Sequence, residues 1–286
     1  MADRVFLAGG LGAVGRHCIT LLRDQGYEVL ATTRRRECAP EIEALGAQPA
    51  ILDVFDSEAV HATLRDFAPT FVLNQLTALP HRLPNPRRIA KDMALTNRLR
   101  GEVTPTLIKA AEEAGANRVV TQSISFAYAP GGECKTEEDP LYLDCPTPFR
   151  GLVEAVQTCE QATLESSIEG VVLRFGLFYG PGTYYADDGD ASVQIRRRRL
   201  PIVRGGAATC SLIHVRDAAA ASVAALTSAS TGIFNIVDDE PVAMAQFTRE
   251  FAALRGAKPP YQIPKWVARL GAGPYGVFLL CDQVAC

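Results

Sequence analysis

The residues best suited to chemistry in this sequence form a glycine-rich turn near its start, at positions 8–15. An apolar run precedes the turn and an amphipathic segment follows it. In a strand–turn–helix unit, glycines let the backbone approach a pyrophosphate, and the helix N-terminus offers free N–H groups to it. A purely structural glycine turn is the alternative. The pattern predicts a bound dinucleotide, contacted by Gly9, Leu11, Gly12, Ala13, Val14 and Gly15.

The end of the second predicted strand, residues 27–33, indicates which dinucleotide binds. It ends in two threonines without an acidic residue, and three arginines follow at positions 34–36. Folds of this kind that bind NAD place a carboxylate there, which accepts a hydrogen bond from the ribose 2′-hydroxyl. A guanidinium would instead pair with a 2′-phosphate. The sequence therefore predicts NADP in preference to NAD, with Thr33 and Arg34 as contacts, and a solvated basic loop is the alternative.

The elements that must position these residues alternate along the first part of the chain. The alternation predicts an α/β fold, a Rossmann-type doubly wound parallel sheet with helices on both faces. After residue 175 it gives way to a loop, short strands and two helices, which predict a small C-terminal substrate lobe. We therefore expect an NAD(P)-binding domain at residues 1–175 and a smaller lobe at residues 176–286 that shares its core. The expected strands are residues 5–8, 27–33, 49–52, 70–74, 118–122 and 171–175 in the first part, and 200–203, 211–214 and 233–237 in the second.

Composition excludes several classes of partner. The 286 residues carry a net charge of -3, so no bulk field favours nucleic acid or a membrane. No apolar stretch has the length of a membrane span, and the N-terminus does not resemble a signal peptide. The 8 cysteines and 4 histidines follow no metal-ligand spacing, which predicts reduced thiols, no metal and a cytoplasmic location. The partner that remains is a small-molecule substrate.

Later motifs, taken together with the glycine turn, resemble those of the extended short-chain dehydrogenase/reductase superfamily, in its NAD-dependent epimerase/dehydratase branch. The resemblance implies an adenine contact at Asp53 and Val54, and a cofactor lining that includes Leu76, Thr77 and Gln122. It also implies a homodimer formed through two helices. Because family members usually continue beyond the point where this chain stops, we expect a truncated or divergent C-terminus. The motifs are Asn97…Gly101, Arg174, Tyr-Gly-Pro-Gly at 179–182, His214…Asp217 and Gly232…Asn235.

The chain departs from this family at its catalytic positions. The family uses a Ser or Thr after the fifth strand and a Tyr-x-x-x-Lys on the next helix, where the lysine lowers the pKa of the tyrosine. Here Ile124 takes the hydroxyl position, and Phe149 and Val153 take those of the tyrosine and lysine. No Tyr-x-x-x-Lys occurs anywhere in the sequence. We therefore expect an atypical member that retains the cofactor site without the usual acid and base.

Other side chains are candidates for the missing chemistry. Ser123, Ser125 and Tyr128 lie near the expected nicotinamide end and are the predicted catalytic residues, although a tyrosine at 128 is more often structural. His214 is expected to fix a turn. We also expect Phe149 and Val153 to face the cofactor cleft across from Ser123. If Arg150 and Glu154 occupy that face instead, the register is wrong and they become the catalytic candidates. The remaining candidates are Tyr179, Tyr184 and Tyr185, and the aspartates 187, 188 and 190, which are read as an acidic loop and not as a metal site.

These observations predict an NAD(P)-dependent oxidoreductase or epimerase-like enzyme that acts on a small metabolite. Its proton would come from an unusual residue or from water. A non-redox lyase, cyclase or isomerase on the same fold is one alternative. A non-catalytic protein that senses NADP is another.

Overall fold

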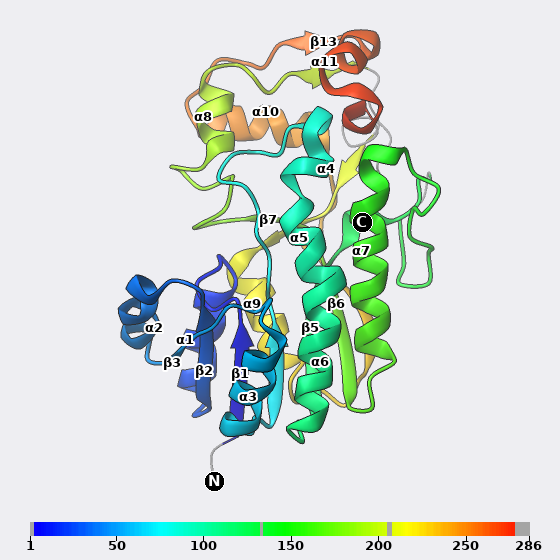
Figure 1. The fold of residues 1–286 in the computed structure, drawn as a ribbon. Coiled ribbons are helices and arrows are strands. Elements are labelled where there is room, and N and C mark those ends of the chain that lie inside the picture. The colour runs from blue at the N-terminus through cyan, green and yellow to red at the C-terminus, as the bar shows by residue number, and fades with distance from the viewer. Residues whose placement is uncertain (1–2, 132–133, 205–207, 278–286) are drawn as a thin grey trace.

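A seven-stranded parallel sheet forms the centre of the computed structural model, which describes residues 3–131, 134–204 and 208–277 (Figure 1). The strand order is β11-β6-β5-β4-β1-β2-β3, and every neighbouring pair is parallel. This is the Rossmann-type α/β fold that the sequence predicted. In chain order the strands are β1 (Arg4–Ala8), β2 (Glu28–Thr33), β3 (Gln48–Ile51), β4 (Phe71–Asn74), β5 (Arg118–Ile124), β6 (Glu169–Phe175) and β11 (Gly232–Ile236).

The strands are continuous apolar runs because helices cover both faces of the sheet. In β1 the side chains alternate between two cores: Val5 and Leu7 enter one, Phe6 and Ala8 the other. All four are fully buried. Helices α1 (Gly15–Asp24) and α9 (Val215–Ala224) cover the first face, and α3 (Ser57–Phe67) and α6 (Thr104–Glu113) cover the second. Helix α7 (Thr147–Leu164) lies beside α6 and packs on β5 and β6.

The helical segment that ends at residue 113 is divided into shorter pieces. They are α4 (Ile89–Asp92), α5 (Ala94–Arg98), the π-helix η3 (Leu99–Val103) and α6. Pro105 lies in the first turn of α6, directly after η3, and has no N–H group to continue the helical hydrogen bonds. A π-helix contains one extra residue per turn, so the side chains beyond η3 are rotated relative to those of α5.

The chain after Phe175 contributes to two regions of the molecule. Strand β11 pairs with β6 at the edge of the central sheet, and α9 packs on α1. The other elements gather above the carboxyl ends of the sheet, in the upper part of Figure 1. They are α8 (Asp190–Arg196), α10 (Met244–Leu254), α11 (Lys265–Val277) and the short pairs β7–β10 (Leu177–Tyr179, Leu212–His214), β8–β13 (Ile202–Val203, Gln262–Ile263) and β9–β12 (Thr209–Cys210, Val242–Ala243). A division at residue 175 stays a prediction.

Two further observations concern the described residues. No helix among them combines the length and the apolar character needed to cross a membrane. Cys134 forms a disulfide, which corrects the expectation that all cysteines are reduced. The free thiols of the same residue ranges are Cys18, Cys38, Cys145, Cys159 and Cys210.

Candidate functional site

The glycine turn joins the carboxyl end of β1 to the start of α1. Gly9 has a positive φ of 91°, and a Cβ atom added to it would lie 2.7 Å from the carbonyl oxygen of Gln75. A Cβ atom on Gly15 would lie 2.2 Å from the oxygen of Gly9. Neither distance can be accommodated, so the packing of the protein itself requires glycine at these two positions.

Position 12 calls for glycine for a different reason. A Cβ atom there would meet the oxygen of Gly9 at 3.4 Å, an ordinary van der Waals distance. The protein therefore does not require glycine at this position, whereas a ligand that approaches the backbone would. Within the described chain, the N–H groups of Leu11, Ala13 and Val14 donate no backbone hydrogen bond, and no side chain caps α1. This arrangement fits a pyrophosphate.

The residues expected at the adenosine end lie after β2 and β3, which are neighbours in the sheet. Arg34 is exposed, and nothing in the described ranges pairs with its guanidinium group. Thr33 accepts a hydrogen bond from the backbone of Arg35 at 3.3 Å. Asp53 is exposed and accepts from the N–H group of Phe55 at 3.1 Å. Val54, beside it, packs against the second core.

The next expected contacts follow along β4 and β5. The N–H group of Leu76 donates to the side chain of Asn74 at 3.2 Å, and Asn74 donates to Thr104 at 3.0 Å. Thr77 and Gln122 are half-buried. The structure thus brings the expected cofactor residues together at the carboxyl ends of β1 to β5, where ligands bind in open α/β sheets. Their contact with a cofactor stays a prediction.

The Tyr-Gly-Pro-Gly segment at 179–182 lies against the glycine turn. Gly182 has a positive φ of 77°, and a Cβ atom on it would lie 3.5 Å from the Cβ atom of Ala13. Its neighbour His214 accepts a hydrogen bond from the N–H group of Arg216 and forms the N-cap of α9. His214 therefore serves as a helix cap, the kind of structural role expected for it.

Two of the predicted catalytic hydroxyls belong to a buried polar network. Ser123 donates to Glu160 at 2.6 Å, and Glu160 forms an ion pair with Arg174 at 2.6 Å. Tyr128 donates to Asn235 at 2.7 Å and accepts from Arg174 at 2.9 Å. Burial raises the pKa of Tyr128. Both hydroxyls are thus engaged within the protein, and a catalytic role for them stays a prediction.

Ser125 differs from the other two candidates. It is buried directly after β5, and its Oγ atom has no hydrogen-bond partner in the described part of the chain. An unsatisfied buried hydroxyl costs free energy unless a ligand or water completes it. Ser125 is therefore the candidate that best fits a contact with a bound molecule.

The three residues expected at the acid and base positions of the family, Ile124, Phe149 and Val153, pack together, and they are called the apolar wall here. They belong to one packed cluster, in which Ile124 is 5% exposed and the other two are fully buried. Phe149 and Val153 lie one turn apart on the same face of α7, whereas Arg150 and Glu154 are exposed. The exposed pair is therefore not the replacement for the missing tyrosine and lysine.

Tyr142 is a residue that sequence reasoning missed. It lies in the loop between β5 and α7, and its half-buried ring packs against the cluster that contains the apolar wall. Its N–H group donates to the oxygen of Ala127 at 2.8 Å. The loop sequence has no periodicity, so its only signal was proximity along the chain to Phe149.

Four of the remaining candidates have structural partners. Tyr184 donates to the oxygen of Pro80 at 2.7 Å, and Tyr185 packs edge-on against two phenylalanines of α10. Asp190 accepts from Leu83 at 2.9 Å, and Asp187 pairs with Arg255. Among the described residues, no three His, Cys, Asp or Glu side chains are grouped as metal ligands would be.

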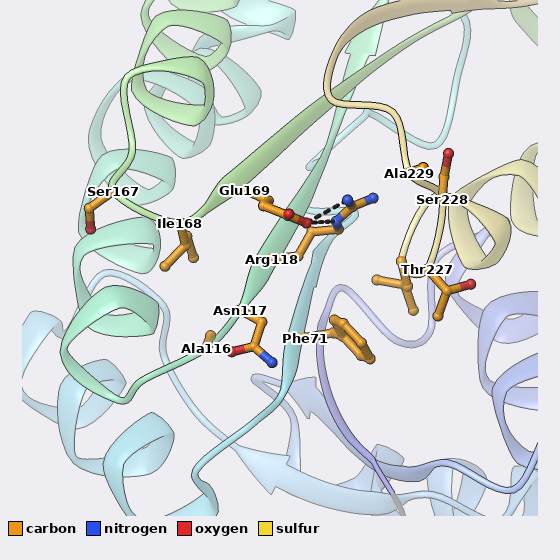
Figure 2. A pocket seen from close by; sticks show the side chains of 11 residues that line it. Phe71, Ala116, Asn117, Arg118, Ser167, Ile168, Glu169, Thr227, Ser228 and Ala229 are labelled. Carbon is orange, nitrogen blue, oxygen red and sulfur yellow. Dashed lines mark hydrogen bonds and ion pairs between the residues drawn. The ribbon is translucent and has the colours of Figure 1, made fainter.

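A shallow pocket lies at the opposite end of the sheet, where β5 and β6 begin (Figure 2). Arg118 crosses it, pairing with Glu169 at 2.5 Å and donating to the oxygen of Ala225 at 2.7 Å. The guanidinium group is thus satisfied by the protein. The glycine turn is at the carboxyl ends of the strands, so this pocket does not belong to the candidate site.

Comparison with known proteins gives the same assignment. The sequence model of the NAD dependent epimerase/dehydratase family matches residues 5–237. A Streptomyces sp protein described as 3-diazoavenalumate denitrifying reductase is 40% identical over 267 residues, which are 93% of this chain and 86% of that protein. A Stigmatella aurantiaca protein, 4-hydroxy-2-methyl-3-oxo-4-farnesyl-3,4-dihydroquinoline-1-oxide ketoreductase, is 27% identical over 281 residues, 94% of this chain and 79% of its own.

Solved structures share the fold. UDP-glucose 4-epimerase from Thermotoga maritima, solved with UDP-glucose, matches with a TM-score of 0.72 and 17% identity over 91% of this chain and 85% of its own. The UDP-glucose 4-epimerase from Thermus thermophilus, solved with NAD, matches with a TM-score of 0.69 and 24% identity over 91% of this chain and 86% of its own.

Proposed function

This chain belongs to the NAD dependent epimerase/dehydratase family, and from this premise we propose that it is an NADP-dependent reductase of a small organic molecule. The observation that carries the proposal is the glycine at position 12. The packing of the protein leaves room for a side chain there, whereas a bound pyrophosphate would not. Both curated relatives are described as reductases.

The preference for NADP rests on Arg34. Its guanidinium group is exposed at the carboxyl end of β2, where no carboxylate is present to accept from a ribose 2′-hydroxyl. A 2′-phosphate there would gain a charge-assisted hydrogen bond. Thr33 and Asp53, on neighbouring strands, would complete this end of the cofactor site.

Two substrate classes are supported by the relatives. One is an aromatic or conjugated acid that carries a diazo group, after the Streptomyces protein. The other is a cyclic ketone, after the Stigmatella protein. Epimerisation is less well supported, because it needs a group that removes and returns a proton, and the apolar wall supplies none.

Two broader features remain part of the proposal. A homodimer through the outer faces of α6 and α7 agrees with the family resemblance. A cytoplasmic location is proposed on the five free thiols of the described ranges, which outnumber the one disulfide-bonded cysteine there. Ser125 is proposed to contact the nicotinamide or the substrate, because among the described residues its hydroxyl group is the buried one without a hydrogen-bond partner.

The test is a fluorescence titration of the full chain with NADPH and NADH, followed by turnover read as loss of NADPH absorbance. We expect tighter binding of NADPH, and oxidation of NADPH with a diazo-bearing aromatic acid or a cyclic ketone. A protein that binds neither dinucleotide, or that binds NADPH and oxidises it with neither substrate class, would contradict the proposal.

A further inference from the structure

We propose that the protein reduces its substrate without supplying a proton, and that its substrate therefore accepts hydride by expelling a leaving group. This inference rests on the proposed function and selects between its two substrate classes. It selects diazo-bearing aromatic molecules as the substrates and excludes ketones. The argument begins with the apolar wall.

The apolar wall removes every acid and base of the family from the place where they would act. Ile124 cannot hold a substrate oxygen, Phe149 cannot give a proton, and Val153 cannot stabilise a phenolate. All three are packed within one cluster, with at most 5% of a side chain exposed. They are thus parts of one buried apolar cluster, and none of these three side chains carries a hydroxyl or ammonium group.

The polar groups nearby do not replace the missing acid and base groups. Ser123 and Tyr128 are held by Glu160, Arg174 and Asn235 in the buried network. Burial raises the pKa of Tyr128. Arg150 and Glu154 lie on α7 with Phe149 and Val153, yet both are exposed. These groups are therefore either engaged or turned to solvent.

Two further side-chain hydroxyl groups lie close to the apolar wall. Ser125 follows Ile124 directly, and Tyr142 packs against the same cluster. A serine without a basic partner is a poor acid at neutral pH, so Ser125 suits hydrogen bonding better than proton transfer. Tyr142 is the group that the experiment must examine as a donor.

The two substrate classes differ in their need for a proton. Reduction of a ketone forms a C–H bond and leaves an alkoxide, whose oxygen must take a proton. An aryl diazonium group takes hydride differently: the hydride electron pair forms the C–H bond, and the C–N electron pair leaves with dinitrogen. The balance is aryl diazonium cation plus NADPH to arene, dinitrogen and NADP⁺, and no proton enters. Apolar surroundings suffice for this reaction, and they also exclude the water that would compete for the substrate.

The experiment compares 4-diazobenzoate with 1-tetralone as probes for the full chain. We expect the enzyme to form benzoate and dinitrogen, with deuterium in benzoate from 4-deuterated NADPH and none from heavy water. The rate should be the same in light and heavy water. Turnover of 1-tetralone should be slower by about a hundredfold or more, the scale of a missing proton donor. Gly12→Val measures the background reaction of NADPH with the probe in solution.

Variants of the apolar wall provide the second arm. The triple variant Ile124→Ser, Phe149→Tyr, Val153→Lys should gain reduction of 1-tetralone, and Phe149→Tyr alone serves if the triple variant does not fold. Glu154→Gln, on the exposed face of α7, is the matched control and should keep the original preference. NADPH titration of each variant reports cofactor binding separately from turnover.

The outcomes distinguish the two proposals. If the original chain reduces 1-tetralone and not 4-diazobenzoate, and Tyr142→Phe or Ser125→Ala abolishes that activity, a hydroxyl group donates the proton. The inference is then wrong while the proposed function stands. If NADPH binds and neither probe is reduced, or if NADPH does not bind, the proposed function fails and this inference fails with it.

Discussion

Gly12 and Gly15 stand in the same turn, yet different partners require their lack of a side chain. A Cβ atom on Gly15 would collide with the oxygen of Gly9, whereas one on Gly12 would meet it at van der Waals distance. Gly12→Val should therefore abolish NADPH binding and leave the unfolding midpoint in urea nearly unchanged. Gly15→Ala, a smaller substitution, should lower that midpoint. Normal NADPH titration of Gly12→Val would show that the turn is structural.

Arg34 should distinguish the two dinucleotides. We expect Arg34→Ala to weaken NADPH by roughly 1–3 kcal/mol, the range of a hydrogen bond to a charged group, and to leave NADH nearly unchanged. Arg65→Ala, on the exposed side of α3, removes the same charge elsewhere and should affect neither. If Arg34→Ala weakens the binding of NADPH and NADH equally, Arg34 does not recognise the 2′-phosphate.

The sequence predicted the residues of the candidate site better than their partners. The glycine turn could be recognised because its residues are adjacent in the chain. The ties of Ser123 to Glu160 and of Tyr128 to Asn235 could not, because these partners lie on α7 and on β11, far away in the sequence. Whether a hydroxyl group is free for chemistry depends on such long-range contacts.

Helix α7 is held to the sheet by the buried ion pair between Glu160 and Arg174, which is almost fully shielded from water. Glu160→Leu should lower the free energy of unfolding by about 3–5 kcal/mol, because it leaves the arginine charge buried and unpaired. Glu102→Gln breaks the exposed pair with Arg98 and should change the free energy of unfolding far less, because water screens an exposed ion pair. Urea unfolding of both variants makes the comparison. Similar small losses would show that water reaches Arg174.

The loop after β4 is tied to the segment before α8 by the hydrogen bond from Tyr184 to Pro80. Burial, and then the nearby charges of Asp190 and Asp92, raise the pKa of Tyr184 from 10.0 to about 12. Because the folded state holds this proton more tightly, the stability it contributes is complete below pH 10 and is lost as pH rises toward 12. In urea unfolding, the free energy of unfolding of Tyr184→Phe should fall less between pH 10 and 12 than that of the original chain. An unchanged slope would contradict the prediction.

Whether a segment forms a helix or a strand was easier to predict than which strands pair with each other. Apolar runs predicted the strands of the central sheet, because burial on both faces leaves a plain sequence signal. The last of them was expected at residues 233–237 and lies at Gly232–Ile236, but as the partner of β6. Hydrophobic pattern carries no information about which edge a strand joins. The π-helix η3 was missed because helical periodicity does not reveal one inserted residue.

The first core takes residues from both parts of the chain. Cys18, Ile19 and Leu22 of α1 pack in one cluster with Ala218 and Val223 of α9. A fragment of residues 1–175 should therefore show no cooperative thermal transition, since it exposes the core face of α1 and an edge of β6. The full chain, measured by the same circular dichroism melt, is the control. A cooperative melt of the fragment would establish an independent domain.

The return of β11 to the sheet has a consequence for how such a protein can acquire new substrates. The elements above the sheet are contributed by two stretches of chain, one before α9 and one after β11. The first stretch is therefore inserted between β6 and α9, and the second follows β11. A relative's substrate region could be transplanted only as two matched pieces, spliced on either side of α9 and β11. Specificity is thus expected to change by point substitution or loop replacement, and exchange of whole modules should be rare.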